Sequence, residues 1–237
     1  MRLSVVTLSL LSCFATGTAC AESPTLYEDW VPSGWKLIAN ATGDLNQDGA
    51  EDALLVVEEQ NADNLVENDG FGARVMNLNP RRLIVLFNTA NGYRKMVSND
   101  SLIPREHDSE IPCLADPLQE GGVAIDRGRI LVELGTWLSC GSYGVTHRTF
   151  TFRFEDDRLR LIGYDLSEFS RSSGEATAYS VNYLTGRIKT TTGENVFEDG
   201  IASVSWSEIP GSGRFYIEGM SPFCYSGDEP GCQWYRW

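Results

Sequence analysis

Oxygen-bearing side chains recur at alternate positions in one short stretch of the chain, and a glycine follows the third of them. The residues at positions 1, 3, 5 and 9 of this stretch are Asp44, Asn46, Asp48 and Asp52. Ca²⁺ takes about six to eight oxygen ligands, and a chain that curls once around the ion presents alternate side chains to it. The spacing predicts a calcium-binding loop over residues 44–52, with a further oxygen from the Ala50 carbonyl and a tight turn at Gly49.

The residues on either side of the loop indicate which kind of calcium site it would be. An EF-hand needs a bidentate Glu at position 12 and a helix on each side. Position 12 here is Leu55, in the apolar run 53–57, whose β-branched content favours a buried strand. Residues 35–39 also have the pattern of a strand, so the loop is predicted to connect two strands. The alternative is a turn rich in Asp, Asn and Gly that binds no ion.

In this setting the loop resembles the D-x-[DN]-x-D-G-x-x-D loops of FG-GAP and VCBS-type repeats, which build integrin-like propellers. The resemblance covers about 25 residues, from Trp35 to Glu59, and implies a bound Ca²⁺. The five proposed ligands would occupy most of the coordination sphere, so a structural ion is predicted. The loop occurs once, so the resemblance implies the loop and its ligands rather than a complete propeller. Segments such as 152–154 and 180–186 look like a group of uncharacterised bacterial exported proteins that carry a single loop of this kind.

Residues 1–21 have the parts of a secretory signal peptide. Arg2 is the basic start, Leu3 to Phe14 form the apolar stretch, and Ala19-Cys20-Ala21 is the cleavage site. Cleavage would leave a single domain over 22–237. No later segment approaches the ~18 apolar residues that a membrane span needs, so a periplasmic or secreted protein without a membrane span is predicted.

The chain is acidic, with 19 basic residues, 33 acidic residues and a formal net charge of −14. Removal of the signal peptide takes away Arg2 and no acid, which makes the charge more negative by one. Such a surface repels nucleic acid, whose binding depends on neutralising phosphates with Lys and Arg. It would suit a basic protein as the partner, and it also serves as an ordinary solubilising surface.

Four of the six cysteines lie after the predicted cleavage site: Cys113, Cys140, Cys224 and Cys232. Export places them in an oxidising compartment, where two disulfides are expected. Three connectivities are possible, and short loops favour Cys113–Cys140 together with Cys224–Cys232. The second pair would close a turn-rich C-terminal loop over 224–232.

Pairs of predicted strands recur around short turns in the rest of the chain. The turns are Asn91-Gly92, Arg127-Gly128, Asp156-Asp157 and Thr185-Gly186. The strands around them are 83–87 with 93–97, 123–125 with 130–132, 149–154 with 159–162, and 179–183 with 187–190. Turn signals every ~8–12 residues predict an all-β fold of antiparallel hairpins, arranged as a sandwich, a barrel or a partial propeller-like meander. Residues 60–80, rich in Asn, Asp and Gly, are predicted to form an exposed insertion.

Catalytic patterns are weak by comparison with the loop. The two histidines, His107 and His147, lie in no zinc-binding motif. A glycosidase with paired carboxylates is one alternative, with aromatic residues such as Trp30, Trp206 and Trp234 serving a sugar cleft. The sequence predicts instead an exported calcium-binding β protein that acts by binding, either as a cell-envelope or extracellular interaction module or as an inhibitor or immunity-type protein against an exported enzyme. The partner would be a basic protein or a glycan.

Overall fold

A computed structural model describes residues 27–209, 213–223 and 233–235. The chain divides into two units, Met1–Trp30 and Val31–Trp237, and each is described by itself. In the first unit the described residues form the 3₁₀ turn η1 (Glu28–Trp30), where the Trp30 amide donates to the Tyr27 carbonyl at 2.9 Å. The predicted signal peptide and the predicted loop over 224–232 lie outside the described residues.

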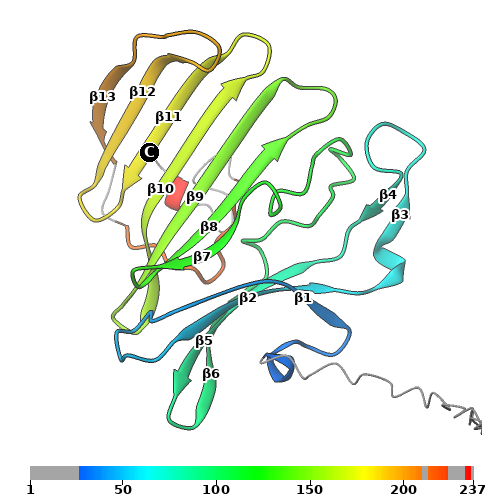
Figure 1. The fold of residues 1–237 in the computed structure, drawn as a ribbon, viewed down its shortest axis with the longest axis vertical. Helices are drawn as coiled ribbons and strands as arrows, with labels where there is room; N and C mark the ends of the chain where they lie inside the picture. Colours follow the sequence, from blue (N-terminus) through cyan, green and yellow to red (C-terminus); the bar gives the residue numbers. More distant parts are fainter. Residues whose placement is uncertain (1–26, 210–212, 224–232, 236–237) are drawn as a thin grey trace, which may run out of the picture. The chain divides into compact units, whose positions relative to one another are not determined.

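The second unit contains a four-stranded antiparallel sheet with the order β1-β2-β5-β6 (Figure 1). Its strands are β1 (Trp35–Gly43), β2 (Asp52–Glu59), β5 (Arg81–Thr89) and β6 (Gly92–Asn99). The central strands β2 and β5 are buried over most of their length. Their apolar runs, Ala53–Val57 and Leu83–Phe87, are continuous rather than alternating, as expected for strands covered on both faces.

The second large sheet of the described residues has seven antiparallel strands in sequence order, from β7 to β13. Its strands are β7 (Gly122–Asp126), β8 (Arg129–Trp137), β9 (Gly144–Glu155), β10 (Arg158–Ser170), β11 (Glu175–Asn182), β12 (Arg187–Asn195) and β13 (Ser203–Glu208). The sheet is an open meander whose edges are β7 and β13. The prediction of an all-β fold of antiparallel hairpins is therefore confirmed.

The four predicted hairpins all form, and each turn contains at least one residue with positive φ. Arg127 and Gly128 both have positive φ, at 49° and 71°, as do Asp156 and Asp157, at 50° and 60°. Positive φ at both central residues defines the type I′ turn, whose twist matches that of the flanking strands. These turns join β7 to β8, with Asp126 opposite Arg129, and β9 to β10, with Glu155 opposite Arg158.

A smaller hairpin occupies the segment predicted as an insertion. The 3₁₀ turn η2 (Ala62–Asn64) leads into β3 (Leu65–Glu67), which pairs with β4 (Val75–Asn77). All three residues of β3 are exposed, whereas Met76 and Asn79 are buried. In the part of the chain that is described, no helix is long and apolar enough to cross a membrane.

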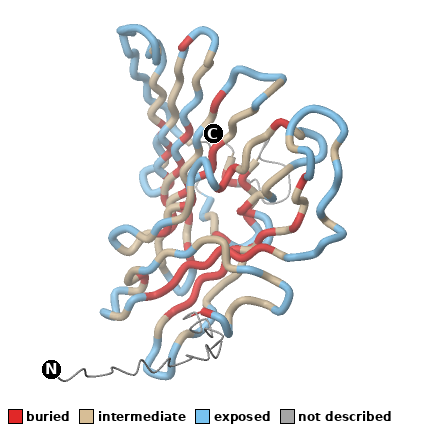
Figure 2. The backbone as a smooth tube through the Cα atoms, turned by 45° about the vertical axis from the view of Figure 1, so that its right-hand side comes forward, coloured by how far each residue is buried: buried red, intermediate tan, exposed pale blue. Residues whose placement is uncertain are grey.

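The two large sheets contribute to one hydrophobic core. Phe87 of the four-stranded sheet meets Phe154 of the seven-stranded sheet edge to face, with ring centroids 4.9 Å apart. Strand β1 runs beside β7, and Gly43 at its end lies so close to β7 that a Cβ would stand 2.5 Å from Cγ2 of Ile125. Figure 2 shows most of the buried residues where the sheets meet, while the hairpin ends are mostly exposed or half-buried.

Further along the seven-stranded sheet, a short C-terminal segment supplies the covering layer. Trp234 in η3 (Gln233–Tyr235) is 1% exposed and packs against Phe150 and Tyr164 at centroid distances of 5.0 and 4.9 Å. The hydroxyl of Tyr183 donates to the Trp234 carbonyl at 2.8 Å. Trp234 is therefore a core residue, and its prediction as part of a sugar cleft is wrong.

A buried cluster of charges lies beneath the β3–β4 hairpin. The guanidinium of Arg81 donates to Glu58 at 2.8 Å and to both oxygens of Asp116, at 2.6 and 2.9 Å. The side chain of Arg81 is 3% exposed, and those of Glu58 and Asp116 are each 9% exposed. The cluster joins β2, β5 and the segment before β7, and it leaves neither carboxylate without a cation.

We expect Arg81→Met to lower the free energy of unfolding by roughly 3–5 kcal/mol, because it leaves two carboxylates buried without their partner. Arg82→Met is the matched control: Arg82 is paired with the exposed Asp100, and loss of that surface pair should cost less than about 1 kcal/mol. Urea unfolding of the two variants measures the difference. Equal losses would contradict the assignment of Arg81 as the organising residue.

A second ion cluster lies at the β9–β10 turn and predicts a dependence on pH. The hydrogen bond from Arg153, followed by that from Arg160, holds the pKa of Glu155 below its ordinary value of 4.5. A carboxyl group with a lowered pKa stabilises the fold above its unfolded-state pKa, and this contribution disappears as the pH falls through the folded-state pKa. The gain is therefore complete at neutral pH and is lost below about pH 4.5.

We expect Glu155→Gln to be less stable than the wild type at pH 7 and to approach it in stability as the pH falls below 4.5. Urea unfolding at a series of pH values measures both curves. Parallel curves across this range would show that the Glu155 pairs contribute no pH-dependent stability.

Candidate functional site

The predicted calcium loop is the connection between β1 and β2. The register pairs Gly43 with Asp52, so the chain leaves the sheet at Asp44 and re-enters it at Asp52. Gly49 has φ +87°, in the region where glycine is favoured, and a Cβ there would meet no atom within 4 Å. The turn therefore requires glycine for its backbone conformation rather than for lack of space.

Asp44 organises the first half of the loop by accepting hydrogen bonds from three backbone amides. Oδ1 accepts from Gln47 at 2.6 Å and from Asp48 at 3.2 Å. Oδ2 accepts from Gly49 at 2.9 Å. The chain thus curls around this carboxylate, and the curl is the backbone arrangement that a cation-binding loop needs.

Asn46 and Asp48 lie beside each other near the surface of the loop. The Asn46 amide donates to Oδ2 of Asp48 at 2.9 Å, and the Asp48 backbone amide donates back to Oδ1 of Asn46 at 3.0 Å. Oδ1 of Asp48 also accepts from the Ala50 amide at 2.8 Å. The two side chains are therefore close in space, and their role as calcium ligands stays a prediction.

Asp52 differs from the other predicted ligands because it is completely buried. Its Oδ2 accepts from the Leu45 amide and its Oδ1 from the Asn88 amide, both at 2.9 Å. The carboxylate thus ties the loop to the end of β5. Burial raises the pKa of Asp52, and repulsion from Asp48 adds to this effect, while the amide hydrogen bonds oppose it.

The residue types fit Ca²⁺ better than their present arrangement does. Within the described ranges, no three His, Cys, Asp or Glu side chains are arranged so that they could hold a metal ion. The Asn46–Asp48 hydrogen bond turns these side chains toward each other. Ion binding would require the two to exchange this contact for the cation. Asp48 is exposed and Asn46 half-buried, so both have room to rotate.

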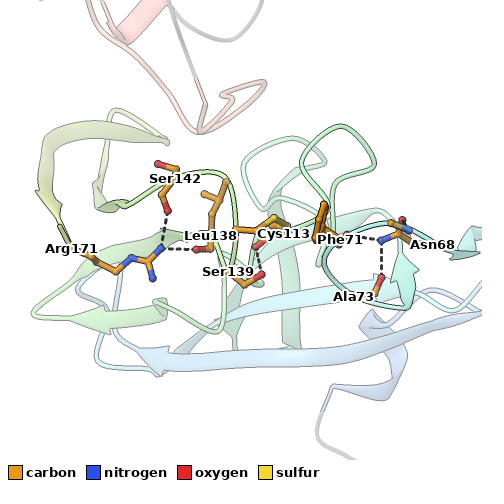
Figure 3. Close-up of a disulfide and its surroundings, with 10 residues drawn as sticks. Asn68, Phe71, Ala73, Cys113, Leu138, Ser139, Ser142 and Arg171 are labelled. Carbon is orange, nitrogen blue, oxygen red and sulfur yellow. Dashed lines mark hydrogen bonds between the residues drawn. A yellow bond between two sulfur atoms is a disulfide. The ribbon is translucent and has the colours of Figure 1, made fainter.

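The predicted disulfide between Cys113 and Cys140 forms, with the two Cα atoms 5.5 Å apart. It ties the segment before β7 to the turn between β8 and β9, and Figure 3 shows its surroundings. The Ser139 amide donates to the Cys113 carbonyl at 2.9 Å, and Arg171 donates to the carbonyls of Leu138 and Ser142 at 2.7 and 2.8 Å. Cys224 and Cys232 lie outside the described residues, so their pairing stays a prediction.

The structure separates the other residues that the sequence singled out. His107 lies beside the Arg81 cluster, where its Nδ1 accepts from the Asn77 amide at 3.1 Å. His147 is exposed on the outer face of β9, and Trp206 is 57% exposed on β13. The guanidinium of Arg187 stacks on Trp206 at 4.5 Å from the ring centroid.

Two contributors to the loop and its surroundings have little signal in the sequence. Asn88 holds Asp52 through a backbone amide, which any residue except proline can supply. The Arg81–Glu58 pair has a weak signal, since Glu58 directly follows one apolar strand run and Arg81 lies two residues before another. A charged residue at the border of a buried strand usually needs a partner, but the sequence does not say which.

No protein-family model, curated protein or solved structure matches this chain.

The position of Asp52 predicts that it stabilises the fold even without an ion. In the presence of chelator, we expect Asp52→Ala to lower the free energy of unfolding by roughly 2–4 kcal/mol, because it leaves two amides without their acceptor. Asp48→Ala is the matched control and should cost less than about 1 kcal/mol, since its contacts are exposed. Chemical unfolding measures both. A larger loss for Asp48→Ala would contradict the anchoring role of Asp52.

Proposed function

We propose that the 44–52 loop binds Ca²⁺ and that the protein is an exported β protein that acts by binding. The observation that supports this most directly is the curl of the chain around Asp44, with Asn46 and Asp48 close together beside it. The proposed ligands are the side chains of Asp44, Asn46, Asp48 and Asp52 and the carbonyl of Ala50. The resemblance to FG-GAP and VCBS-type loops supports the same ligand set.

The electrostatics of the loop favour a bound cation. The proposed ligands place three carboxylates within nine residues of chain, and Glu51 adds a fourth acid there. The hydrogen bonds described above to the ligand carboxylates come from neutral amides. Burial, with a smaller contribution from repulsion by Asp48, raises the pKa of Asp52, so a positive charge between the two carboxylates would stabilise both ionised forms. A divalent ion supplies that charge and replaces the mutual contact of Asn46 and Asp48 with shared coordination.

The role proposed for the ion is structural. Leu45, the second residue of the loop, is buried in the core that both sheets share, and Gly43 just before the loop packs against Ile125 of β7. An ion that holds the loop closed would therefore hold β1 in place beside β7. A loss of the ion should loosen this junction rather than remove a catalytic group.

Export is supported by the Cys113–Cys140 disulfide, since disulfides persist mainly in oxidising compartments. The acidic composition suits a soluble binding protein whose partner is a basic protein or a glycan. A cell-envelope or extracellular interaction module is the role that combines these features.

Calorimetric titration tests the calcium proposal. The proposed ligands include three carboxylates but no bidentate closing Glu, so we expect a Kd of about 10⁻⁴–10⁻³ M. At a Kd of ~0.1 mM, ~1 mM Ca²⁺ would stabilise the fold by about 1.4 kcal/mol. Asp48→Asn should weaken binding, because it removes one ligand charge. Glu51→Gln is the matched control, since Glu51 is exposed in the same loop and is not a proposed ligand.

Two results would contradict the proposal. One is a wild-type melting temperature that is the same in Ca²⁺ and in chelator, together with no heat of titration. The other is equal weakening by Asp48→Asn and Glu51→Gln, which would indicate a general attraction to acidic surface rather than a defined site.

A further inference from the structure

The inner face of the seven-stranded sheet changes character along its strands. One row of neighbouring side chains is apolar and packs in the core: Phe150, Tyr164, Val181 and Ile188. The next row is mixed, with Arg148, Leu166, Tyr179 and Thr190 side by side. The row beyond it is polar, with Thr146, Glu168 and Thr177. The inward face therefore becomes hydrophilic while the sheet continues.

A cavity of about 400 Å³ lies at this transition. Its floor is formed by Leu166 and Ile188, which are 6% and 4% exposed. Its polar and aromatic lining comes from Glu168, Tyr179, Thr190, Ser207 and Tyr235. The volume falls within the range of about 300–1,000 Å³ that small-molecule sites occupy, and the lining combines a small apolar floor with a larger polar surface.

We infer that this cavity binds a short uncharged saccharide. A sugar ring has an apolar C–H face and a rim of hydroxyl groups. The floor and the rings of Tyr179 and Tyr235 offer apolar and aromatic surface to the C–H face. Thr190, Ser207 and Glu168 offer hydrogen-bonding groups to the sugar hydroxyls. A carboxylate that can accept two sugar hydroxyls at once is a stronger acceptor than a neutral group.

The charges around the cavity favour an uncharged ligand over a charged one. The described residues that line it include no Lys or Arg, and the chain carries a net charge of −14, so an anionic sugar would be repelled. The nearest cation in the rows, Arg148, is engaged with the hydroxyls of Thr136 and Thr146, each at 3.0 Å. Glu168 is exposed, and a single water-screened carboxylate gives a cation little binding energy.

The opposite face of the same strands provides an internal control. It has a smaller depression of about 200 Å³, whose lining includes His147, Asp165 and Lys189. Asp165 and Glu168 are both exposed acids of β10 that lie on opposite faces of the sheet. Substitution of either to Ala changes the net charge equally, but only Glu168→Ala alters the cavity.

The experiment is a titration followed by ¹⁵N–¹H correlation spectra, with glucose, N-acetylglucosamine, cellobiose and diacetylchitobiose as uncharged probes and choline and glucuronate as charged ones. We expect at least one uncharged probe to saturate at millimolar concentration, with shifts centred on Glu168, Tyr179 and Thr190. Glu168→Ala should weaken its binding roughly tenfold, as loss of a charge-assisted hydrogen bond does. Asp165→Ala should leave the affinity unchanged.

A second pair of variants tests the hydroxyl contribution. Thr190→Val should weaken binding roughly threefold to tenfold, whereas Thr191→Val, on the opposite face of β12, should have no effect. The inference is overturned if no uncharged probe saturates, if only choline or glucuronate binds, or if the shifts centre on Asp165 and Lys189. Each titration is repeated in Ca²⁺ and in chelator. A failure of the calcium proposal appears only in the calorimetry of the loop, and a failure of the saccharide site appears only here.

Discussion

The joint between the two sheets depends on one close approach of backbone to side chain. At the end of β1, only a hydrogen at the Cα of Gly43 leaves room for Ile125 of β7. The chain must then turn away and return at Asp52, and the turn is held by the buried Asp52 carboxylate, which binds the amides of Leu45 and Asn88. Asp52, one of the proposed calcium ligands, thus also closes the joint, so a substitution at Asp52 would affect ion binding and the stability of the fold together.

The buried carboxylates of Glu58, Asp116 and Asp52 are stabilised in two different ways, and the difference decides where a cation would be useful. Glu58 and Asp116 face the full positive charge of Arg81. Asp52 is held by the dipoles of backbone amides, which stabilise its charge without cancelling it, and Asp48 lies close enough to oppose its ionisation. A divalent ion near the Arg81 cluster would compete with a cation already present. In the loop it would supply the charge that the amides do not.

The parts of the fold that could be predicted from the sequence are those determined by neighbouring residues. Arg127-Gly128 and Asp156-Asp157 form the predicted tight turns because the strands on either side and the residues between them specify a hairpin locally. The division of the strands between two sheets was not predictable, because alternation shows that a strand has a buried face but not which sheet it joins. The β13 strand was missed for a related reason: all of its residues are exposed, so it has no buried face to signal its presence.

In the predicted site, too, local interactions could be predicted from the sequence and distant ones could not. The spacing of Asp44, Asn46 and Asp48 was enough to predict a loop in which these side chains lie close together, since the interactions span only a few residues. The structural role of Asp52 was not predictable, because it depends on Asn88, 36 residues away. The cavity was not predictable either, because its lining residues come from separate parts of the chain between Leu166 and Tyr235. In β10 an irregularity between Leu161 and Gly163 changes which residues face inward, so Leu161 and then Tyr164 point to the same side.

The lengths of the strands explain why a cavity exists at this place. Strand β10 has 13 residues and would extend about 44 Å, whereas a layer of four strands is only about 20 Å wide. In Figure 1 the four-stranded sheet runs across the strands of the larger sheet, so it covers their lower part alone. Trp234 extends the cover over Phe150 and Tyr164, and the apolar residues end one row later. Beyond that row the side chains of the sheet face water and are polar. The cavity lies where the buried apolar floor meets this polar surface.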